Sequence, residues 1–167
     1  DGLMKHILVT GGAGFIGSNV VKHALEQGLK ITVIDSLEPT SKGMDEYIQS
    51  GIDYIQCDIR DLDQLNSIKG EFDSLIHLAA QVSVPKSFTH QKETEEINGK
   101  GTENVLGLAE KLGIKRFITA SSSAVYGDYE QIMDLLKVEV RLSWEKYGKS
   151  IFVIKLLRDD LRGLASD

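Results

Sequence analysis

Cysteine, proline and long apolar runs are scarce in this sequence. Its 167 residues include a single cysteine, Cys57, and only two prolines. One cysteine excludes an intramolecular disulfide, and we expect Cys57 to be a buried core residue rather than a reactive thiol. No stretch approaches the roughly 18 consecutive apolar residues that a membrane-spanning helix needs, and the N-terminus shows no basic region before an apolar segment. We therefore expect a cytoplasmic protein without a membrane partner.

Positive charge is also in short supply. Lysine and arginine total 19 against 25 aspartates and glutamates, which gives a formal net charge of −6. An acidic chain binds phosphate backbones poorly, so nucleic acid is not an expected partner. The histidines are scattered without the spacing of metal ligands, so we expect no metal site. Residues 1–3, before Met4, are interpreted as an added remnant, which leaves 4–167 as one domain.

Short apolar runs alternate along the chain with stretches of helical periodicity. Strands are expected over 6–10, 30–34, 54–57, 74–78 and 116–120, and helices over 15–27, 45–50, 62–68 and 92–112. In the first helix, Ile16, Val20 and Leu25 are expected on the buried side. The alternation predicts an α/β fold, a doubly wound parallel sheet of the Rossmann type with about six strands and helices on both faces.

The C-terminal part of the chain has a less regular pattern. Residues 129–147 are expected to form a helix, although the alternating segment 138–142 also fits a strand. Residues 151–154 are expected to form the sixth strand, with a helix as the alternative.

A glycine-rich loop follows the first strand. Gly11, Gly14 and Gly17 have the spacing of a dinucleotide-binding turn. In such a turn one glycine permits the bend, one lets the backbone approach a pyrophosphate, and one lets the helix pack closely on the sheet. Phe15 and Ile16 open the helix, whose free N–H groups would face the phosphates. Because the loop joins a strand to a helix, we interpret these five residues as a pyrophosphate site rather than as a structural turn.

Acids stand at the ends of the next two strands. Asp35 is expected to accept hydrogen bonds from the adenosine ribose and to repel a 2′-phosphate, which favours NAD over NADP. The alternative is that Asp35 only caps a turn. Asp58 and Ile59 follow the third strand, where they would meet the adenine, with helix capping by Asp58 as the alternative.

The order and spacing of these motifs resemble those of a known enzyme family. Over residues 4 to about 128 the sequence is similar to the extended short-chain dehydrogenases, and within them to the NAD-dependent nucleotide-sugar epimerases and dehydratases. The resemblance is carried by Gly11 to Gly17, Asp58-Ile59-Arg60-Asp61, His77-Leu78-Ala79-Ala80-Gln81, Asn98, Gly101-Thr102, Asn104, and Ser121-Ser122-Ser123-Ala124-Val125-Tyr126-Gly127.

The resemblance implies roles for residues beyond the glycine loop. Leu78, Ala79 and Ala80 would line the nicotinamide side of NAD, and Asn98 would help to hold the cofactor region. Ser122 would be the catalytic hydroxyl that hydrogen-bonds the reacting oxygen of the sugar. From the residues alone, His77 on the fourth strand is expected to be a packed core histidine.

The sequence departs from the family at its catalytic tyrosine and lysine. Tyr147 aligns with the family's tyrosine and is the candidate proton acceptor, but Ile151 stands where the lysine is expected. A second alignment puts Lys137 at the lysine position and Met133 at the tyrosine position. Neither alignment restores both residues, and Tyr147 as a packing aromatic at a helix end is the alternative.

The resemblance implies an NAD-dependent epimerase that acts at C4 of a UDP-hexose by transient hydride transfer to NAD. Family chains are about twice as long, so we expect the cofactor half alone, without the substrate domain and with impaired activity. An inactive NAD-binding module, or a dehydratase or reductase of the same family, is the alternative. Family members dimerise through the long helix, here expected from Lys92, and the helix after the serines, so the resemblance implies a homodimer.

Overall fold

The computed structural model describes residues 5–37, 52–121 and 150–154. The chain divides into two compact units, residues 1–117 and 118–167. All helices of the described ranges lie in the first unit. None of these helices combines the length and the apolarity that crossing a membrane requires.

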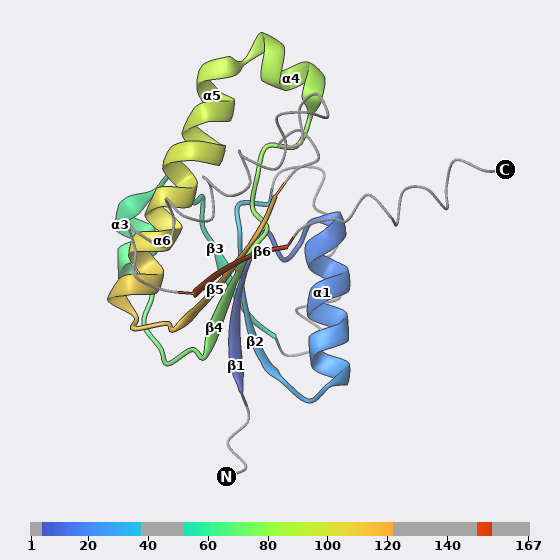
Figure 1. Cartoon of the computed structure of the whole chain (residues 1–167), viewed down its shortest axis with the longest axis vertical. Coiled ribbons are helices and arrows are strands. Elements are labelled where there is room, and N and C mark those ends of the chain that lie inside the picture. The colour runs from blue at the N-terminus through green and yellow to red at the C-terminus, as the bar shows by residue number, and fades with distance from the viewer. Residues whose placement is uncertain (1–4, 38–51, 122–149, 155–167) are drawn as a thin grey trace, which may run out of the picture. The chain divides into compact units, whose positions relative to one another are not determined.

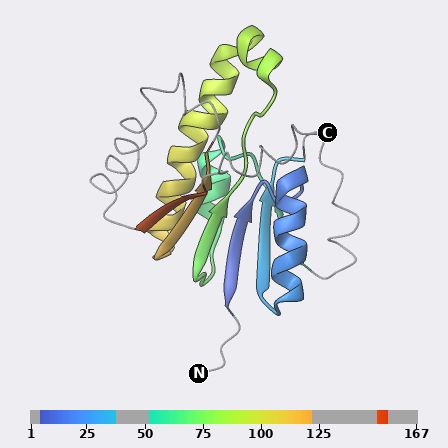
Figure 2. The same ribbon diagram turned by 45° about the vertical axis from the view of Figure 1, so that its right-hand side comes forward.

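A parallel sheet forms the centre of the first unit. Its strands are β1 (His6–Thr10), β2 (Lys30–Asp35), β3 (Asp53–Gln56) and β4 (Ser74–His77), in the order β3-β2-β1-β4, and the beginning of β5 (Arg116–Ala120) follows β4. β1 pairs in parallel with both β2 and β4, and Figure 2 shows these three arrows pointing the same way. The carboxyl ends of these strands therefore meet at one edge. In the second unit the rest of β5 is followed by β6 (Ser150–Ile154).

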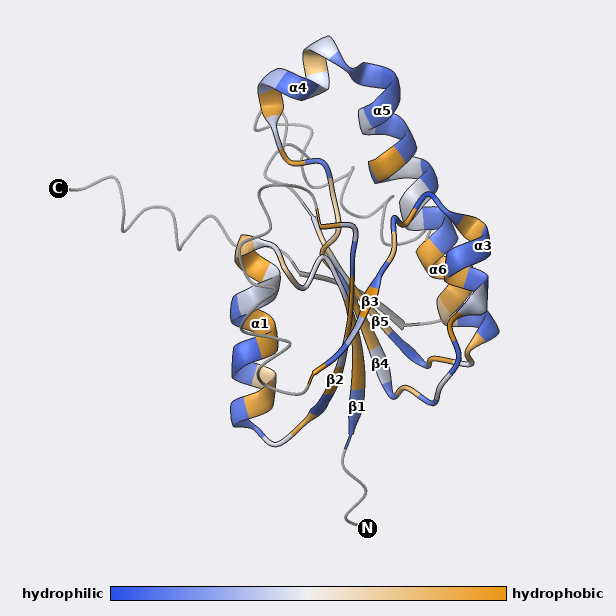
Figure 3. Cartoon of the chain, turned by 180° about the vertical axis from the view of Figure 1, so that it is seen from behind, coloured by the Kyte–Doolittle hydropathy of each residue, from blue (hydrophilic) through white to orange (hydrophobic). Residues whose placement is uncertain are grey.

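Helices cover both faces of this sheet. α1 (Phe15–Glu26) contacts β1 and β2, whereas α6 (Thr102–Lys111) contacts β4 and α3 (Leu62–Ser67) on the other side, as Figure 1 shows. On the α1 side the core consists of Val9, Ala13, Val21, Ala24, Ile31 and Val33. In Figure 3 the strands are hydrophobic in their middle and hydrophilic at their ends, whereas orange and blue alternate along α1 and α6. The doubly wound Rossmann fold predicted from the sequence is confirmed.

Helix ends follow the local chemistry of the sequence. Asp61 caps α3 by accepting a hydrogen bond from the backbone N–H of Gln64. Gly28 and Gly113 follow α1 and α6 with φ of 72° and 67°, the left-handed conformation that ends many helices and that glycine adopts without strain. Both helices therefore end within one residue of the ends expected at 27 and 112.

The buried side of α1 differs from the predicted one. Ile16 and Leu25 are 54% and 37% exposed, and the buried residues are instead Gly17, Val21 and Ala24. Gly17 lies against the glycine loop, where a Cβ would be 2.0 Å from the carbonyl oxygen of Gly11, so the side of α1 that carries Gly17, Val21 and Ala24 is the buried one.

The long helix expected over 92–112 is interrupted. It consists of α5 (Gln91–Glu95), a π-helical segment η1 (Glu96–Gly101) and α6. A further short helix, α4 (Val84–Thr89), precedes it and was not predicted; Ser83 caps α4 and Pro85 lies in its first turn. The strand expected at 54–57 is displaced by one residue, and the strand expected at 74–78 ends one residue earlier. β6 confirms the strand expected at 151–154, and the helices expected at 45–50 and 129–147 lie outside the described residues.

Candidate functional site

The glycine loop lies against the end of β4. Gly11 has φ of 71°, and a Cβ on it would lie 2.6 Å from the backbone nitrogen of Ala79. A Cβ on Gly17 would lie 2.0 Å from the carbonyl oxygen of Gly11. Any side chain at either position would therefore collide with backbone, which cannot move aside cheaply. The loop is tight because it brings β1, β4 and α1 into direct contact.

The N-terminus of α1 is open for an anionic ligand. Gly14 occupies the N-cap position and supplies no side-chain cap, and the first turn contains no acidic residue. In the described part of the chain, the backbone N–H groups of Phe15 and Ile16 donate to no protein acceptor. Phe15 is 89% exposed. Free N–H groups at the positive end of a 12-residue helix fit a phosphate group.

Asp35 connects the end of β2 to the glycine loop. Its Oδ2 atom accepts a hydrogen bond of 2.9 Å from the N–H of Ala13, and its Oδ1 atom accepts one of 2.9 Å from the N–H of Leu37. Asp35 is buried, and Leu37 has a positive φ of 60°. The acid thus caps the turn after β2, as the alternative interpretation expected, and it also holds the loop. Its role toward a ribose stays a prediction.

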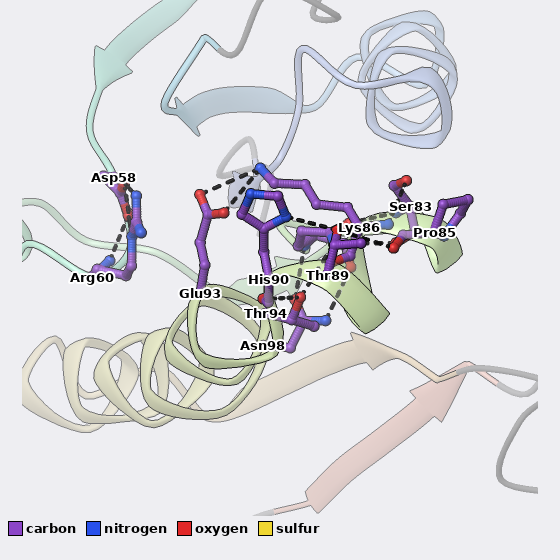
Figure 4. A network of polar contacts seen from close by, with 11 residues as sticks. Asp58, Arg60, Ser83, Pro85, Lys86, Thr89, His90, Glu93, Thr94 and Asn98 are labelled. Carbon is purple, nitrogen blue, oxygen red and sulfur yellow. Dashed lines mark hydrogen bonds and ion pairs between the residues drawn. The ribbon is translucent and has the colours of Figure 1, made fainter.

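Asp58 forms an ion pair with Arg60, a residue of the same motif to which the sequence assigned no role. The guanidinium of Arg60 donates to both carboxylate oxygens of Asp58, with Nη2 at 2.6 Å from Oδ2, and this pairing holds the pKa of Asp58 below its ordinary value. Figure 4 shows the pair. The helix-capping alternative for Asp58 is wrong, because Asp61 caps α3. An arginine two residues after the acid was the available signal.

The segment after β3 is tied to the second helical layer. Ile59 is buried, and its carbonyl oxygen accepts a hydrogen bond of 3.0 Å from Nδ2 of Asn104 on α6. A Cβ on Gly101 would meet the Ile59 side chain at 2.6 Å, so glycine permits this close approach. These contacts hold the backbone beside Asp58 at the carboxyl edge of the sheet.

Asn98 clamps the loop that follows β4. Its Oδ1 accepts a hydrogen bond of 2.8 Å from the backbone N–H of Gln81, and its Nδ2 donates to the Gln81 carbonyl at 3.0 Å. Leu78, at the start of this loop, donates its N–H to the carbonyl oxygen of Thr10 at 3.0 Å. The segment from Leu78 to Gln81, hereafter the β4 loop, therefore lies between the glycine loop and the π-helical segment.

A polar network continues from the β4 loop into α4 and α5. The side chain of Gln81 donates to Thr94 at 3.2 Å, and Lys86 forms an ion pair of 3.2 Å with Glu93. Figure 4 shows Lys86 of α4 reaching toward Glu93 of α5. Because the outer side of α4 exposes Val84 and Phe88, the network lies on its inner side. Sequence periodicity missed α4, which spans only six residues.

Two buried titratable groups, His77 and Cys57, lie near the carboxyl edge of the sheet. His77 is 4% exposed, and burial lowers its pKa to about 4. Cys57 is 2% exposed, and burial, followed by the neighbouring Asp61 and Asp58, raises the pKa of its thiol to about 11. Both were expected to be core residues, and their burial confirms this. The candidate catalytic residues Ser122 and Tyr147 lie outside the described residues.

Comparisons with known proteins agree with this architecture. The NAD dependent epimerase/dehydratase family matches residues 7–147. A putative UDP-glucose 4-epimerase of Methanocaldococcus jannaschii is 38% identical over 125 residues, which cover 73% of this chain and 40% of that protein. A UDP-N-acetyl-alpha-D-glucosaminuronate decarboxylase of Bacillus cytotoxicus is 34% identical, with 75% of this chain and 39% of that protein covered.

Solved structures show the same likeness. The UDP-glucose 4-epimerase of Thermus thermophilus in complex with NAD gives a TM-score of 0.73 at 28% identity, covering 87% of this chain and 53% of that one. The UDP-glucose 4-epimerase of Thermotoga maritima with UDP-glucose gives 0.74 at 29% identity, covering 89% and 54%. The chain spans about two fifths of the curated relatives' length and about half of the solved chains. With its glycine loop, Rossmann sheet and matched residues, the chain belongs to the NAD dependent epimerase/dehydratase family, whose cofactor is NAD.

Proposed function

We propose that residues 4–167 form the NAD-binding domain of a nucleotide-sugar enzyme that acts at C4 of a UDP-hexose. The observation that carries the proposal is the carboxyl edge of the sheet. There the open N-terminus of α1, the buried Asp35 and the β4 loop lie around one glycine loop. This combination fits a dinucleotide better than a single phosphate, because it offers contacts on both sides of the helix N-terminus.

The proposed contacts divide along the cofactor. Backbone N–H groups at the α1 N-terminus would bind the pyrophosphate, and Asp35 the adenosine ribose. The end of β3 would meet the adenine and the β4 loop the nicotinamide, with Asn98 holding that loop. The proposed cofactor residues are Gly11, Gly14, Phe15, Ile16, Gly17, Asp35, Asp58, Ile59, Leu78, Ala79, Ala80 and Asn98.

The proposed chemistry needs one hydroxyl and one base from this chain. Bound NAD supplies the hydride acceptor for C4 of the sugar. Ser122 would hydrogen-bond the reacting oxygen, and Tyr147 would accept its proton. A neighbouring cation normally lowers the pKa of a catalytic phenol, and Ile151 cannot do this. We therefore expect slow turnover from this chain.

Decarboxylation of a UDP-sugar acid is a second candidate, favoured by the 34% identity to the decarboxylase of Bacillus cytotoxicus. Both reactions can begin with oxidation at C4. A C4 ketone beside a carboxylate on C5 is a β-keto acid and loses carbon dioxide, whereas a sugar with a neutral C6 takes the hydride back. The substrate itself therefore separates the two candidates.

The test has a binding arm and a reaction arm. Saturating NAD should raise the melting temperature, because a ligand at 100 times its Kd stabilises by roughly 2.7 kcal/mol. An unchanged melting temperature would overturn the proposal. The chain is then incubated with NAD and UDP-glucose, UDP-galactose or UDP-glucuronate and followed by NMR. A C4 epimer supports epimerisation, and a UDP-pentose supports decarboxylation. Ser122→Ala should abolish either product while NAD binding is retained.

A further inference from the structure

A continuous line of hydrogen bonds joins the end of β1 to the π-helical segment through His77. Oγ1 of Thr10 lies 2.6 Å from Nδ1 of His77, and Nε2 of His77 lies 3.0 Å from Oγ1 of Thr102. The Thr102 hydroxyl in turn donates to the carbonyl oxygen of Asn98 at 2.7 Å. The line crosses from β1 over β4 to the helical layer, through residues far apart in the sequence.

The donor and the acceptor of every hydrogen bond in this line follow from the chemistry of the groups that it joins. A carbonyl oxygen can only accept a hydrogen bond, so the Thr102 hydroxyl donates its single proton to the carbonyl oxygen of Asn98. Its oxygen must then accept from Nε2–H of His77, which leaves Nδ1 of the neutral ring as an acceptor for the Thr10 hydroxyl. The opposite tautomer would require a second proton on Thr102. The structure therefore assigns the Nε2–H tautomer to His77.

The environment of His77 keeps the ring neutral. The side chain is 4% exposed, it lies beside Phe117 with ring centroids 6.1 Å apart, and burial lowers its pKa to about 4. A protonated ring would carry a donor at Nδ1 and would displace the Thr10 proton. A neutral ring with one donor and one acceptor is what this line of bonds requires.

Both ends of the line reach the β4 loop. At one end, Oγ1 of Thr10 lies 3.3 Å and 3.4 Å from the N–H groups of Leu78 and Ala79, as their acceptor. At the other end, Asn98 clamps Gln81 through two hydrogen bonds. The β4 loop is thus held at its beginning and at its end by one set of connected groups.

The π-helical segment places Asn98 at the end of this line. Asn98 lies within η1, and Thr102 is the first residue of α6. π-helical turns are rare and occur frequently at functional sites. Here the wide turn presents the Asn98 side chain to Gln81 and its carbonyl to Thr102, so the irregular helix serves both contacts.

We propose that His77, as the Nε2–H tautomer, is a positioning residue that locks the β4 loop between β1 and the π-helical segment for the nicotinamide half of NAD. The proposal rests on the NAD-binding function above. It predicts that damage to the line weakens NAD more than ADP, because ADP lacks the nicotinamide half and does not need the β4 loop.

Thr102 offers the sharpest substitution, because its hydroxyl can be removed without loss of volume. We expect Thr102→Val to weaken NAD about tenfold, equivalent to about 1.4 kcal/mol, and to leave the Kd of ADP within about twofold. Thr102→Ser keeps the hydroxyl and should bind NAD like the original chain. Thr32→Val is the matched control, since Thr32 makes a 2.8 Å bond to His6 at the opposite edge of the sheet.

The tautomer is measured independently of any ligand. Long-range ¹H–¹⁵N correlation spectra at neutral pH should show the proton of His77 on Nε2. A proton on Nδ1 would overturn the proposal even if Thr102→Val failed to fold. Equal weakening of NAD and ADP, or a Thr102→Ser variant as weak as Thr102→Val, would also overturn it. If the chain bound neither NAD nor ADP while His77 carried its proton on Nε2, the proposed NAD-binding function would be wrong, whereas the tautomer of His77 would be correct.

Discussion

The carboxylate of Asp35 accepts a hydrogen bond of 2.9 Å from the backbone N–H of Ala13, so an acid at the end of β2 holds the middle of the glycine loop. The loop is therefore positioned by β2 as well as by the strand that precedes it. Asp35 is buried, and its other oxygen accepts the N–H of Leu37. Two backbone donors thus depend on one carboxylate.

Replacing this carboxylate by an amide should loosen the loop. In Asp35→Asn only one oxygen remains to accept, and the new NH₂ group faces a backbone donor. We expect a loss of roughly 1–3 kcal/mol in the free energy of unfolding and at least tenfold weaker NAD binding. Calorimetric titration and denaturant unfolding measure these. Asp53→Asn, at an exposed acid paired with Lys30, is the control and should change both little. Equal effects would show that Asp35 has no special part in the loop.

Alanine substitutions at Gly11 and Gly28 should distinguish the effect of backbone strain from that of steric collision. Both have positive φ, 71° and 72°, but a Cβ on Gly11 meets Ala79 while a Cβ on Gly28 meets nothing within 4 Å. We expect Gly28→Ala to cost about 1 kcal/mol and to keep NAD binding. Gly11→Ala should cost roughly 3 kcal/mol or more and abolish binding. Denaturant unfolding compares the two, and similar losses would mean that the loop can retreat from the β4 loop.

Asp58 is expected to recognise the exocyclic amino group of adenine. Its carboxylate is negatively charged through its pairing with Arg60, and a carboxylate accepts a hydrogen bond from an amino group but not from a carbonyl. The original chain should therefore bind NAD about tenfold more tightly than nicotinamide hypoxanthine dinucleotide. In Asp58→Asn this preference should disappear. Competition titrations measure the ratio, and a preference that survives in Asp58→Asn would assign adenine recognition to other groups.

Stability should fall in mildly acidic solution because of His77. Its pKa is about 4 in the folded chain and about 6.5 when unfolded. Between these values the unfolded chain binds a proton that the folded chain does not, so the free energy of unfolding falls as the pH falls. The loss from pH 7 to pH 5 should be about 2 kcal/mol.

The matched variant for this pH dependence is His77→Gln. It should be less stable at pH 7, because Gln cannot reproduce both hydrogen bonds, but it should lose about 2 kcal/mol less than the original chain on going to pH 5. Parallel pH profiles of unfolding in the two proteins would contradict this, because they would show that His77 has the same pKa in the folded and the unfolded chain. His23→Gln, at an exposed histidine, controls for the loss of an imidazole.

Local sequence signals predicted much of the fold. The apolar run 6–10 and the glycines that follow it predict a strand and a tight turn, since a buried strand followed by Gly11 and Gly14 must turn sharply. Asp61 caps α3 and Gly28 follows α1 because these residues act on the backbone within a few positions of themselves. Such effects need no knowledge of the rest of the chain.

Some residues of the proposed cofactor site could also be predicted from local sequence signals. Asp35 could be predicted because an acid after the second strand is a local signal. Its hydrogen bond to Ala13 joins residues 22 positions apart in the sequence and could not be predicted in this way. Arg60 was noted only as part of a motif and was given no role, because an exposed arginine is common; only the folded turn shows that it binds both oxygens of Asp58.

The sequence by itself determined the alternation of strands and helices, the glycine turn and the helix ends, because each depends on neighbours along the chain. The tertiary structure alone decided which side of α1 is buried, where the long helix widens at Asn98, and which groups His77 joins. Thr10 and Thr102 lie 67 and 25 positions from His77, so no local pattern brings them together. The parallel pairing of β1 with β4 places Thr10 beside His77, and the packing of α6 on β4 places Thr102 there.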